Sequence, residues 1–157
     1  MALHVEALNR ALVNIPAEKV RMHVCWGNYP GPHHCDVPLA DIVDILWTAK
    51  PHAILFEAAN PRHAHEWTLF ETVKPPEGKI LVPGVIECQS PYIEHPELVA
   101  QRIVRFAGAV GRENVIAGAD CGFASFATTC EVHPTIVWVK LAALAGGARI
   151  ASKELWR

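Results

Sequence analysis

Residues 53–58, AILFEA, form an apolar run that ends in a carboxylate. A strand that is apolar throughout is typical of a parallel sheet covered on both faces. The same order of strand, loop and helix recurs on either side of this run. We expect strands at residues 21–26, 53–58, 79–87 and 114–123.

Apolar residues at helical spacing predict the helices around these strands. Pro38 and Pro96 suit the first turn of a helix, and Gly111 suits a helix end. Residues 148–157 are expected to be a tail or a short extra helix. The other helices are expected within residues 5–14, 38–49, 60–73, 96–111 and 134–146.

Four strand-loop-helix units in succession predict an α/β fold with a parallel sheet and right-handed crossovers. Two architectures fit this order: an open doubly wound sheet, or part of a (β/α)8 barrel. A whole barrel typically needs about 250 residues, and this chain has 157. No glycine-rich phosphate loop follows the first strand, which weakens the nucleotide-binding form of the open sheet.

The composition fits one globular domain over residues 1–157, because 51% of the residues are hydrophobic. A formal net charge of −2 predicts no general attraction to nucleic acid or to anionic membranes. The apolar stretches look shorter than the roughly 20 residues of a membrane span. The charged N-terminal segment does not resemble a signal peptide. We therefore expect a cytoplasmic protein with no nucleic-acid or membrane partner.

The cysteines point away from a disulfide framework, because the chain has five of them and looks cytosolic. Metal binding, catalysis or plain burial remain as their roles. Cys88 and Cys130 are not expected to be metal ligands.

Chemically active side chains collect where the expected strands end, which is where parallel α/β folds carry their function. The strand ends carry, in chain order, His23 with Cys25, Glu57, Glu87, and Asp120 with Cys121. The spacing of His23 and Cys25 puts both side chains on the same face of one strand. Glu57 and Cys121 come from strands that could share the same rim.

Imidazole, thiolate and carboxylate groups are the ligands that zinc prefers. We therefore expect a Zn²⁺ site formed by His23, Cys25, Cys121 and Glu57. Glu57 would be the weakest ligand, and an incoming thiol could displace it. Metal coordination removes the thiol proton near neutral pH, so such a site would catalyse alkylation of a sulfur.

The residues alone leave other roles open for each of these side chains. The two cysteines could be buried apolar residues, the histidine a hydrogen-bonded core residue, and Glu57 a salt-bridged carboxylate. Asp120 could orient His23. Glu87 could be a general acid or base, or only a strand-end carboxylate. We take Glu87 and Asp120 as the candidate catalytic residues.

Several other residues have simpler interpretations. Residues 33–35, HHC, lie in a Gly/Pro-rich loop and are expected to be ordinary loop residues. Arg62 could bind a substrate carboxylate or sulfonate, or be solvated. Trp47 and Trp138 lie among apolar residues at helical spacing and are expected in the core.

Four short motifs follow one another along the chain: HVCWGN (23–28), FEAANPRH (56–63), GVIECQSP (84–91) and ADCGF (119–123). Together they resemble the C-terminal catalytic barrel of cobalamin-independent methionine synthase and its relatives, which include the epoxyalkane:coenzyme M transferases. The motifs keep the family's order, and the resemblance covers roughly residues 5–150.

The resemblance implies a (β/α)8 TIM barrel that transfers a carbon group to a thiol. It implies that His23, Cys25, Glu57 and Cys121 bind the catalytic zinc. In methionine synthases the acceptor is homocysteine and the donor is a 5-methyltetrahydrofolate. Only the last four β/α units have a counterpart here, so we expect the C-terminal half of such a barrel. Its open edges predict a homodimer, a separately encoded N-terminal half, or a fragment that is inactive alone.

One motif departs from the family. Methionine synthases have G-V-x-D-x-H-S-P, where this chain has GVIECQSP, so Glu87 replaces the aspartate and Gln89 replaces the histidine. If that histidine is the proton donor to the folate leaving group, Gln89 cannot replace it. This departure favours a coenzyme M-type transferase, or another thiol alkyltransferase, over methionine synthesis.

Overall fold

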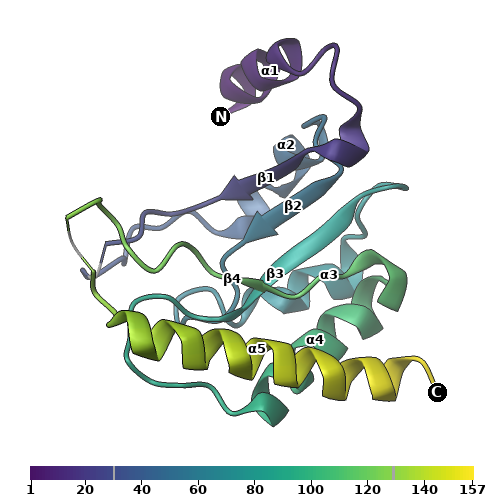
Figure 1. Ribbon diagram of the computed structural model, residues 1–157. Coiled ribbons are helices and arrows are strands. Elements are labelled where there is room, and N and C mark those ends of the chain that lie inside the picture. Colours follow the sequence, from purple (N-terminus) through teal and green to yellow (C-terminus); the bar gives the residue numbers. More distant parts are fainter. Residues whose placement is uncertain (30, 129) are drawn as a thin grey trace.

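A single parallel sheet is the centre of the computed structural model, which describes residues 1–29, 31–128 and 130–157 (Figure 1). Its strands stand side by side in chain order, each parallel to the next. They are β1 (Arg21–Val24), β2 (Ala53–Phe56), β3 (Ile80–Ile86) and β4 (Gly118–Ala119).

The strand order decides between the two expected architectures. A doubly wound sheet reverses direction at a switch point, whereas here every crossover steps to the next strand on the same side. Right-handed crossovers that always step in one direction place their helices on one face of the sheet. The sheet is therefore the curled half of a (β/α)8 barrel, which confirms the expected fold class.

Five α-helices and four short 3₁₀ helices accompany the sheet in the described residues. The α-helices are α1 (Ala2–Ala11), α2 (Val43–Trp47), α3 (Leu69–Thr72), α4 (Pro96–Val110) and α5 (Pro134–Leu155). The 3₁₀ helices are η1 (Ala17–Lys19), η2 (Leu39–Asp41), η3 (Glu66–Thr68) and η4 (Arg112–Asn114). Pro96 stands in the first turn of α4 as expected, and His95 caps this helix by accepting a hydrogen bond from Glu97 N.

The hydrophobic core fills the space between the sheet and the helices on one face. Its first cluster joins Ile54 and Phe56 of β2 to Leu46, Phe70 and Phe106 of α2, α3 and α4. A second cluster joins β3 to α4 and α5. This burial fixes which side chains of each strand point away from the helices.

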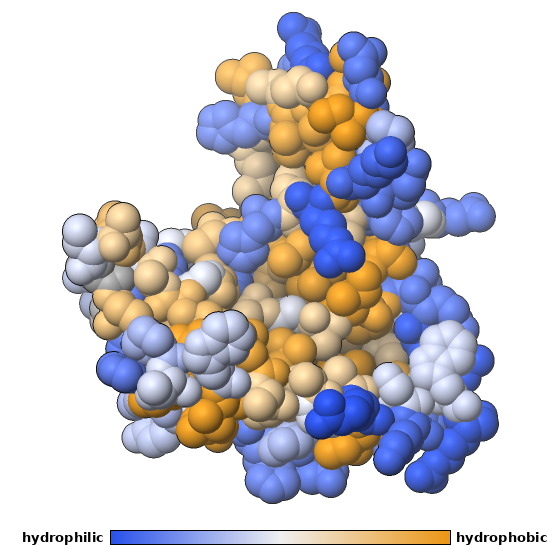
Figure 2. Space-filling model, viewed as in Figure 1, coloured by the Kyte–Doolittle hydropathy of each residue, from blue (hydrophilic) through white to orange (hydrophobic). Residues whose placement is uncertain are grey.

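The opposite face of the sheet carries the alternate side chains. In β1, Arg21 and His23 are exposed, while Met22 and Val24, which alternate with them, pack toward the core. In register beside His23, Leu55 of β2 is only partly buried. Figure 2 shows hydrophobic side chains across the middle of the molecule between α1 and α5. In the described part of the chain this face is the inside of the half-barrel.

The fourth strand is much shorter than the expected 114–123. Its regular part is Gly118–Ala119, preceded by one bridge between Leu81 and Val115, and its register with β3 shifts. The strands approach closely here, because a Cβ on Gly118 would lie 3.0 Å from a methyl of Val82. The irregular register turns the residues after Ala119 toward the rim of the sheet.

The last helix is longer than expected, because α5 continues through Gly146 and Gly147 to Leu155. Gly147 is buried against α4, so the packing between the helices holds the glycines in helical conformation. By length and composition alone this 22-residue helix could cross a membrane, which corrects the expectation that no segment is long enough. It nevertheless buries Lys140, whose Nζ lies 2.8 Å from Glu94 Oε2.

One core assignment is wrong. Trp138 on α5 is 72% exposed, because helical spacing alone does not decide which face of a long apolar helix is covered. Trp47 does pack against the first core cluster, as expected.

Replacing Gly147 with alanine should lower the free energy of unfolding by about 1–3 kcal/mol, because the added methyl group overpacks the helix interface. A Cβ there would lie 2.4 Å from Val99 Cβ and 2.7 Å from Pro96 O. Gly108→Ala in α4 is the matched control, because nothing lies within 4 Å of its added Cβ. Urea unfolding followed by circular dichroism measures both variants. A Gly147→Ala protein as stable as the wild type would contradict this packing.

Candidate functional site

Three of the predicted metal ligands meet at the carboxyl-terminal rim of the sheet. His23 is in β1, Cys25 follows that strand directly, and Cys121 follows β4. His23 Nε2 and Cys25 Sγ each lie 3.3 Å from Cys121 Sγ. One donor atom from each residue lies within 4.8 Å of the others. This is the one such His/Cys/carboxylate cluster that we find in residues 1–29, 31–128 and 130–157.

Curling of the sheet is what makes this meeting possible. The outer strands of a flat four-stranded sheet would stand about 14 Å apart, three strand spacings. Cys25 and Cys121 follow those outer strands, yet their sulfur atoms are 3.3 Å apart. The half-barrel shape is therefore a requirement of the cluster.

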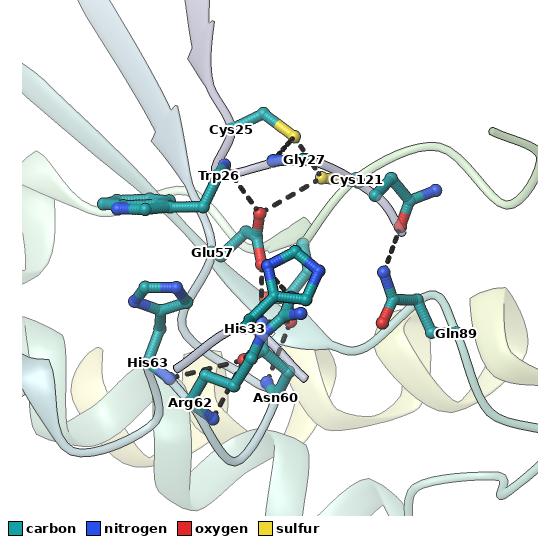
Figure 3. A network of polar contacts seen from close by, with 12 residues as sticks. Cys25, Trp26, Gly27, His33, Glu57, Asn60, Arg62, His63, Gln89 and Cys121 are labelled. Atoms are coloured by element: carbon teal, nitrogen blue, oxygen red, sulfur yellow. Dashed lines mark hydrogen bonds and ion pairs between the residues drawn. The ribbon is translucent and has the colours of Figure 1, made fainter. Parts of the chain in front are cut away.

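Glu57, the fourth predicted ligand, adjoins the cluster through Cys121 (Figure 3). It follows β2 and is 2% exposed. Its Oε1 lies 3.6 Å from Cys121 Sγ and accepts a hydrogen bond from Trp26 N at 3.1 Å. Its Oε2 accepts hydrogen bonds from Asn60 Nδ2 at 2.8 Å and from Arg62 Nη2 at 2.9 Å.

The donor set and its spacing fit a zinc ion. Zinc–sulfur bonds of about 2.3 Å and zinc–nitrogen bonds of about 2.0 Å give tetrahedral edges of roughly 3.5–3.8 Å. The observed separations of 3.3 Å from His23 Nε2 and Cys25 Sγ to Cys121 Sγ are close to those edges. His23, Cys25 and Cys121 could hold the ion, and Glu57, which adjoins this set through Cys121, is the candidate for a fourth ligand.

The local electrostatics also suit a cation. Although His23 is partly exposed, partial desolvation of its imidazole lowers its pKa, which keeps the ring neutral and able to bind a metal. Burial, the contact with Cys25 and the charge of Glu57 raise the pKa of the Cys121 thiol well above its usual range. A bound dication would act in the opposite direction and favour the thiolate. Gly27, with φ of +100°, directs its N–H to Cys25 Sγ at 3.2 Å.

Cys88 lies behind the cluster and is not one of its donors. Its thiol donates to Cys121 O at 2.7 Å, and Cys121 N donates back to its sulfur at 3.0 Å. Burial raises the pKa of Cys88 to about 12, so the thiol stays neutral. Cys88 therefore positions the backbone of Cys121.

Asp120 is buried beside the cluster and holds the loop that follows β2. Its carboxylate accepts hydrogen bonds at 2.8 Å from the backbone N–H groups of Ala58, Ala59 and Asn60 and from Asn60 Nδ2. Among the described residues Asp120 makes no hydrogen bond to His23. The contacts therefore do not support the possibility that Asp120 orients His23. Asp120 therefore holds in place the residues that directly follow Glu57.

Glu87 directly follows β3 at the edge of a cavity, and its carboxylate accepts hydrogen bonds from its own loop. It accepts hydrogen bonds from Gln89 N at 2.9 Å and Ser90 N at 2.7 Å. Its own N–H donates to Glu94 Oε1 at 2.8 Å. Glu87 thus shapes the loop that carries Gln89.

Asn28 joins three loops over the site, a role that no pattern in the sequence indicates. Its Oδ1 accepts from Gln89 Nε2 at 3.0 Å, and its Nδ2 donates to Gly122 O at 2.9 Å. Ser125 Oγ also contacts Asn28 O. The loops after β1, β3 and β4 are therefore tied together beside Cys25 and Cys121, and the Gln89 amide is used in the tie.

A second polar network extends from Glu57 away from the cluster. Arg62 Nε lies 4.0 Å from Asp36 Oδ2, and His63 Nε2 lies 3.4 Å from the same oxygen. Burial lowers the pKa of His63, but its hydrogen bond to Glu66 and the nearby carboxylates outweigh this and raise it. Trp26 stacks on His63 with ring centroids 4.3 Å apart. Within the predicted 33–35 loop, His33 contacts Asp36 and joins this network.

A cavity of about 660 Å³ opens next to the cluster, a size that suits a small-molecule ligand. Its walls come mainly from the loops after β2 and β3, including Tyr92, and from the first turns of α4, including Leu98. A second pocket, narrower and only about 10 Å³ in volume, has Glu57 and Cys121 in its lining. The residues common to both are Asn60, Arg62, Glu87 and Gln89.

Two methionine synthases are similar to this chain. The chain is 29% identical over all 157 residues to the methionine synthase of Thermococcus kodakarensis. Its fold matches the B12-independent methionine synthase of Shewanella sp. W3-18-1, solved in complex with selenomethionine, with a TM-score of 0.75 and 24% identity over 97% of the chain. The chain resembles the catalytic domain of cobalamin-independent methionine synthase.

This likeness has a defined extent. The chain spans 40% of the length of the Thermococcus methionine synthase and 43% of the Shewanella chain. No family model matches the sequence. The half-barrel fold and the similarity to B12-independent methionine synthase agree with the resemblance seen in the four sequence motifs.

Asp120→Asn should lower the free energy of unfolding by about 1–3 kcal/mol, because an amide NH₂ would face buried N–H donors. The affected donors are the backbone N–H groups of residues 58–60. Asp41→Asn is the control, because Asp41 is exposed. Chemical denaturation of both variants measures the difference. Equal stability of the two variants would contradict the role assigned to Asp120.

Proposed function

We propose that this chain is a single zinc-binding domain of a thiol methyl- or alkyltransferase. His23, Cys25 and Cys121 hold the zinc ion, and Glu57 is its exchangeable ligand. The observation that carries the proposal is the convergence of these donors at the strand ends of a half-barrel that resembles methionine synthase. A bound zinc ion lowers the pKa of a coordinated thiol and so presents a thiolate nucleophile.

The chain's own residues prepare the site for this chemistry. Neutral His23 can serve as a metal ligand, and the N–H of Gly27 can stabilise charge on Cys25. The N–H of Trp26 fixes one oxygen of Glu57. The adjoining cavity has room for a small-molecule thiol and for the group that donates its carbon.

Gln89 favours a coenzyme M-type transfer as the second candidate reaction. An amide cannot act as a proton donor in the way an imidazole does, and this amide is hydrogen-bonded to Asn28. A donor whose leaving group needs no imidazole, such as an epoxide, agrees better with this position. Homocysteine with a methyl donor remains the first candidate, because the relatives are methionine synthases.

The half-barrel also bears on the assembly of the enzyme. In the described residues β1 and β4 each pair with one neighbouring strand, so each has a free edge. We propose that a second copy or a separately encoded barrel half covers these edges, and that the protein acts in the cytoplasm. Light scattering of the purified chain, alone and with a candidate partner, tests this assembly.

Purified wild-type protein should contain one zinc ion per chain, and Cys121→Ser should lose most of it, because Cys121 lies between the other donors. Mass-spectrometric metal analysis gives the result. Cys35→Ser is the control, because Cys35 is an exposed loop cysteine outside the cluster. It should keep full zinc content.

A wild-type protein without stoichiometric zinc would refute the proposed function. Where zinc is present, alkylation assays with homocysteine and with coenzyme M distinguish the two candidate reactions. Chelation should abolish activity toward the preferred thiol, and added zinc should restore it.

A further inference from the structure

The two carboxylate oxygens of Glu57 have separate surroundings. Oε1 faces the cluster, 3.6 Å from Cys121 Sγ, with the N–H of Trp26 beside it. Oε2 faces away and is held by Asn60 Nδ2 and Arg62 Nη2 at 2.8 and 2.9 Å. Glu57 can therefore approach a metal through one oxygen while the other stays bound to the protein.

Arg62 is fixed at the far side of this carboxylate. Its backbone N–H and its Nε both donate to Asn60 Oδ1, at 3.0 and 3.2 Å. Its Nε also lies 4.0 Å from Asp36 Oδ2. The side chain is 22% exposed, so the guanidinium group stands between two carboxylates with little solvent around it.

A buried carboxylate requires compensation for its charge. Glu57 is 2% exposed, and among the described residues Arg62 is the one cation within ion-pair distance of it. While Glu57 is a metal ligand, its charge is shared between the metal and Arg62. When Glu57 gives up its place to a thiol, the metal no longer compensates it, and the arginine does.

We propose that Arg62 is a positioning residue. It keeps its ion pair with the Glu57 carboxylate when a thiol replaces Glu57 at the metal. This inference rests on the proposed function, because it concerns the exchange of Glu57 as a ligand. No covalent bond is made or broken in Arg62. It lowers the free energy of the state in which Glu57 has left the metal, and so makes room for the thiol.

The position of Arg62 in the cavities supports this role. It lines both the 660 Å³ cavity and the narrower pocket that reaches Cys121. A thiol in the large cavity would therefore lie against Arg62, the ion-pair partner of Glu57.

The role predicts a specific pattern for Arg62→Gln. Without the arginine, displaced Glu57 would be a buried carboxylate without a cation, so Glu57 should hold the metal more firmly. Thiol binding should weaken by about 10- to 100-fold, as expected for losing a hydrogen bond to a charged group. Metal retention should stay the same or increase. A purely structural arginine would instead cause loss of metal together with loss of stability.

The experiment uses Co²⁺-substituted protein, whose absorption reports the sulfur ligands at the metal. Wild type, Arg62→Gln, Arg62→Lys and the control Arg10→Gln are titrated with homocysteine and, separately, with coenzyme M. Arg10 is an exposed arginine that also pairs with a glutamate, Glu6, which makes it a matched control. A chelator competition measures how firmly each variant retains the metal. Arg62→Lys keeps the charge and should give an intermediate titration midpoint.

The Glu57→Gln variant completes the test, because it has no carboxylate at this position for Arg62 to pair with. There, the further change Arg62→Gln should not shift the thiol midpoint. The inference is overturned if Arg62→Gln binds thiol like the wild type, if it loses metal in proportion to stability, or if its effect persists with Glu57→Gln. If Arg62→Gln fails to fold, a wild-type midpoint in Arg62→Lys overturns it. Wild-type protein that holds neither metal would overturn the proposed function itself.

Discussion

The buried carboxylate of Asp120 is the interaction on which the site depends. Asp120 directly follows β4. Its carboxylate reaches across the intervening strand β3 and accepts hydrogen bonds from three backbone N–H groups of the loop after β2. The crossing is possible because residue 84 of β3 is a glycine. A Cβ at Gly84 would lie 1.9 Å from Asp120 Oδ1. Glycine at this position thus permits two non-adjacent strands to be tied at the rim.

These hydrogen bonds have a direct chemical consequence, because the residues next to the hydrogen-bonded groups are the proposed ligands. Cys121 follows Asp120, and Glu57 precedes the loop that Asp120 holds. Curling brings the end of β1 to the same place, with Cys25 Sγ 3.3 Å from Cys121 Sγ. The fold therefore sets the position of a cluster whose members come from β1, β2 and β4.

The sequence predicts the parts of this arrangement that depend on local patterns. Apolar runs locate β1, β2 and β3, and the strand-end rule selects His23, Cys25 and Cys121. It overestimates β4, because the register shift beside Gly84 depends on how two strands pack. It also places Trp138 in the core, although which face of α5 is covered depends on α4. Asn28 joins loops that are far apart in the sequence, and residue spacing does not predict that these loops meet in space.

The acidic residues at the strand ends differ in how their charge is compensated, and this difference separates their roles. Asp120 and Glu87 are satisfied by N–H groups of fixed loops, which suits carboxylates that stay in place. Glu57 alone among them has an arginine partner in the described residues. Backbone N–H groups carry no formal charge, whereas a guanidinium group is always charged and can compensate a buried carboxylate. The acid that we propose to exchange at the metal is therefore the one paired with a cation.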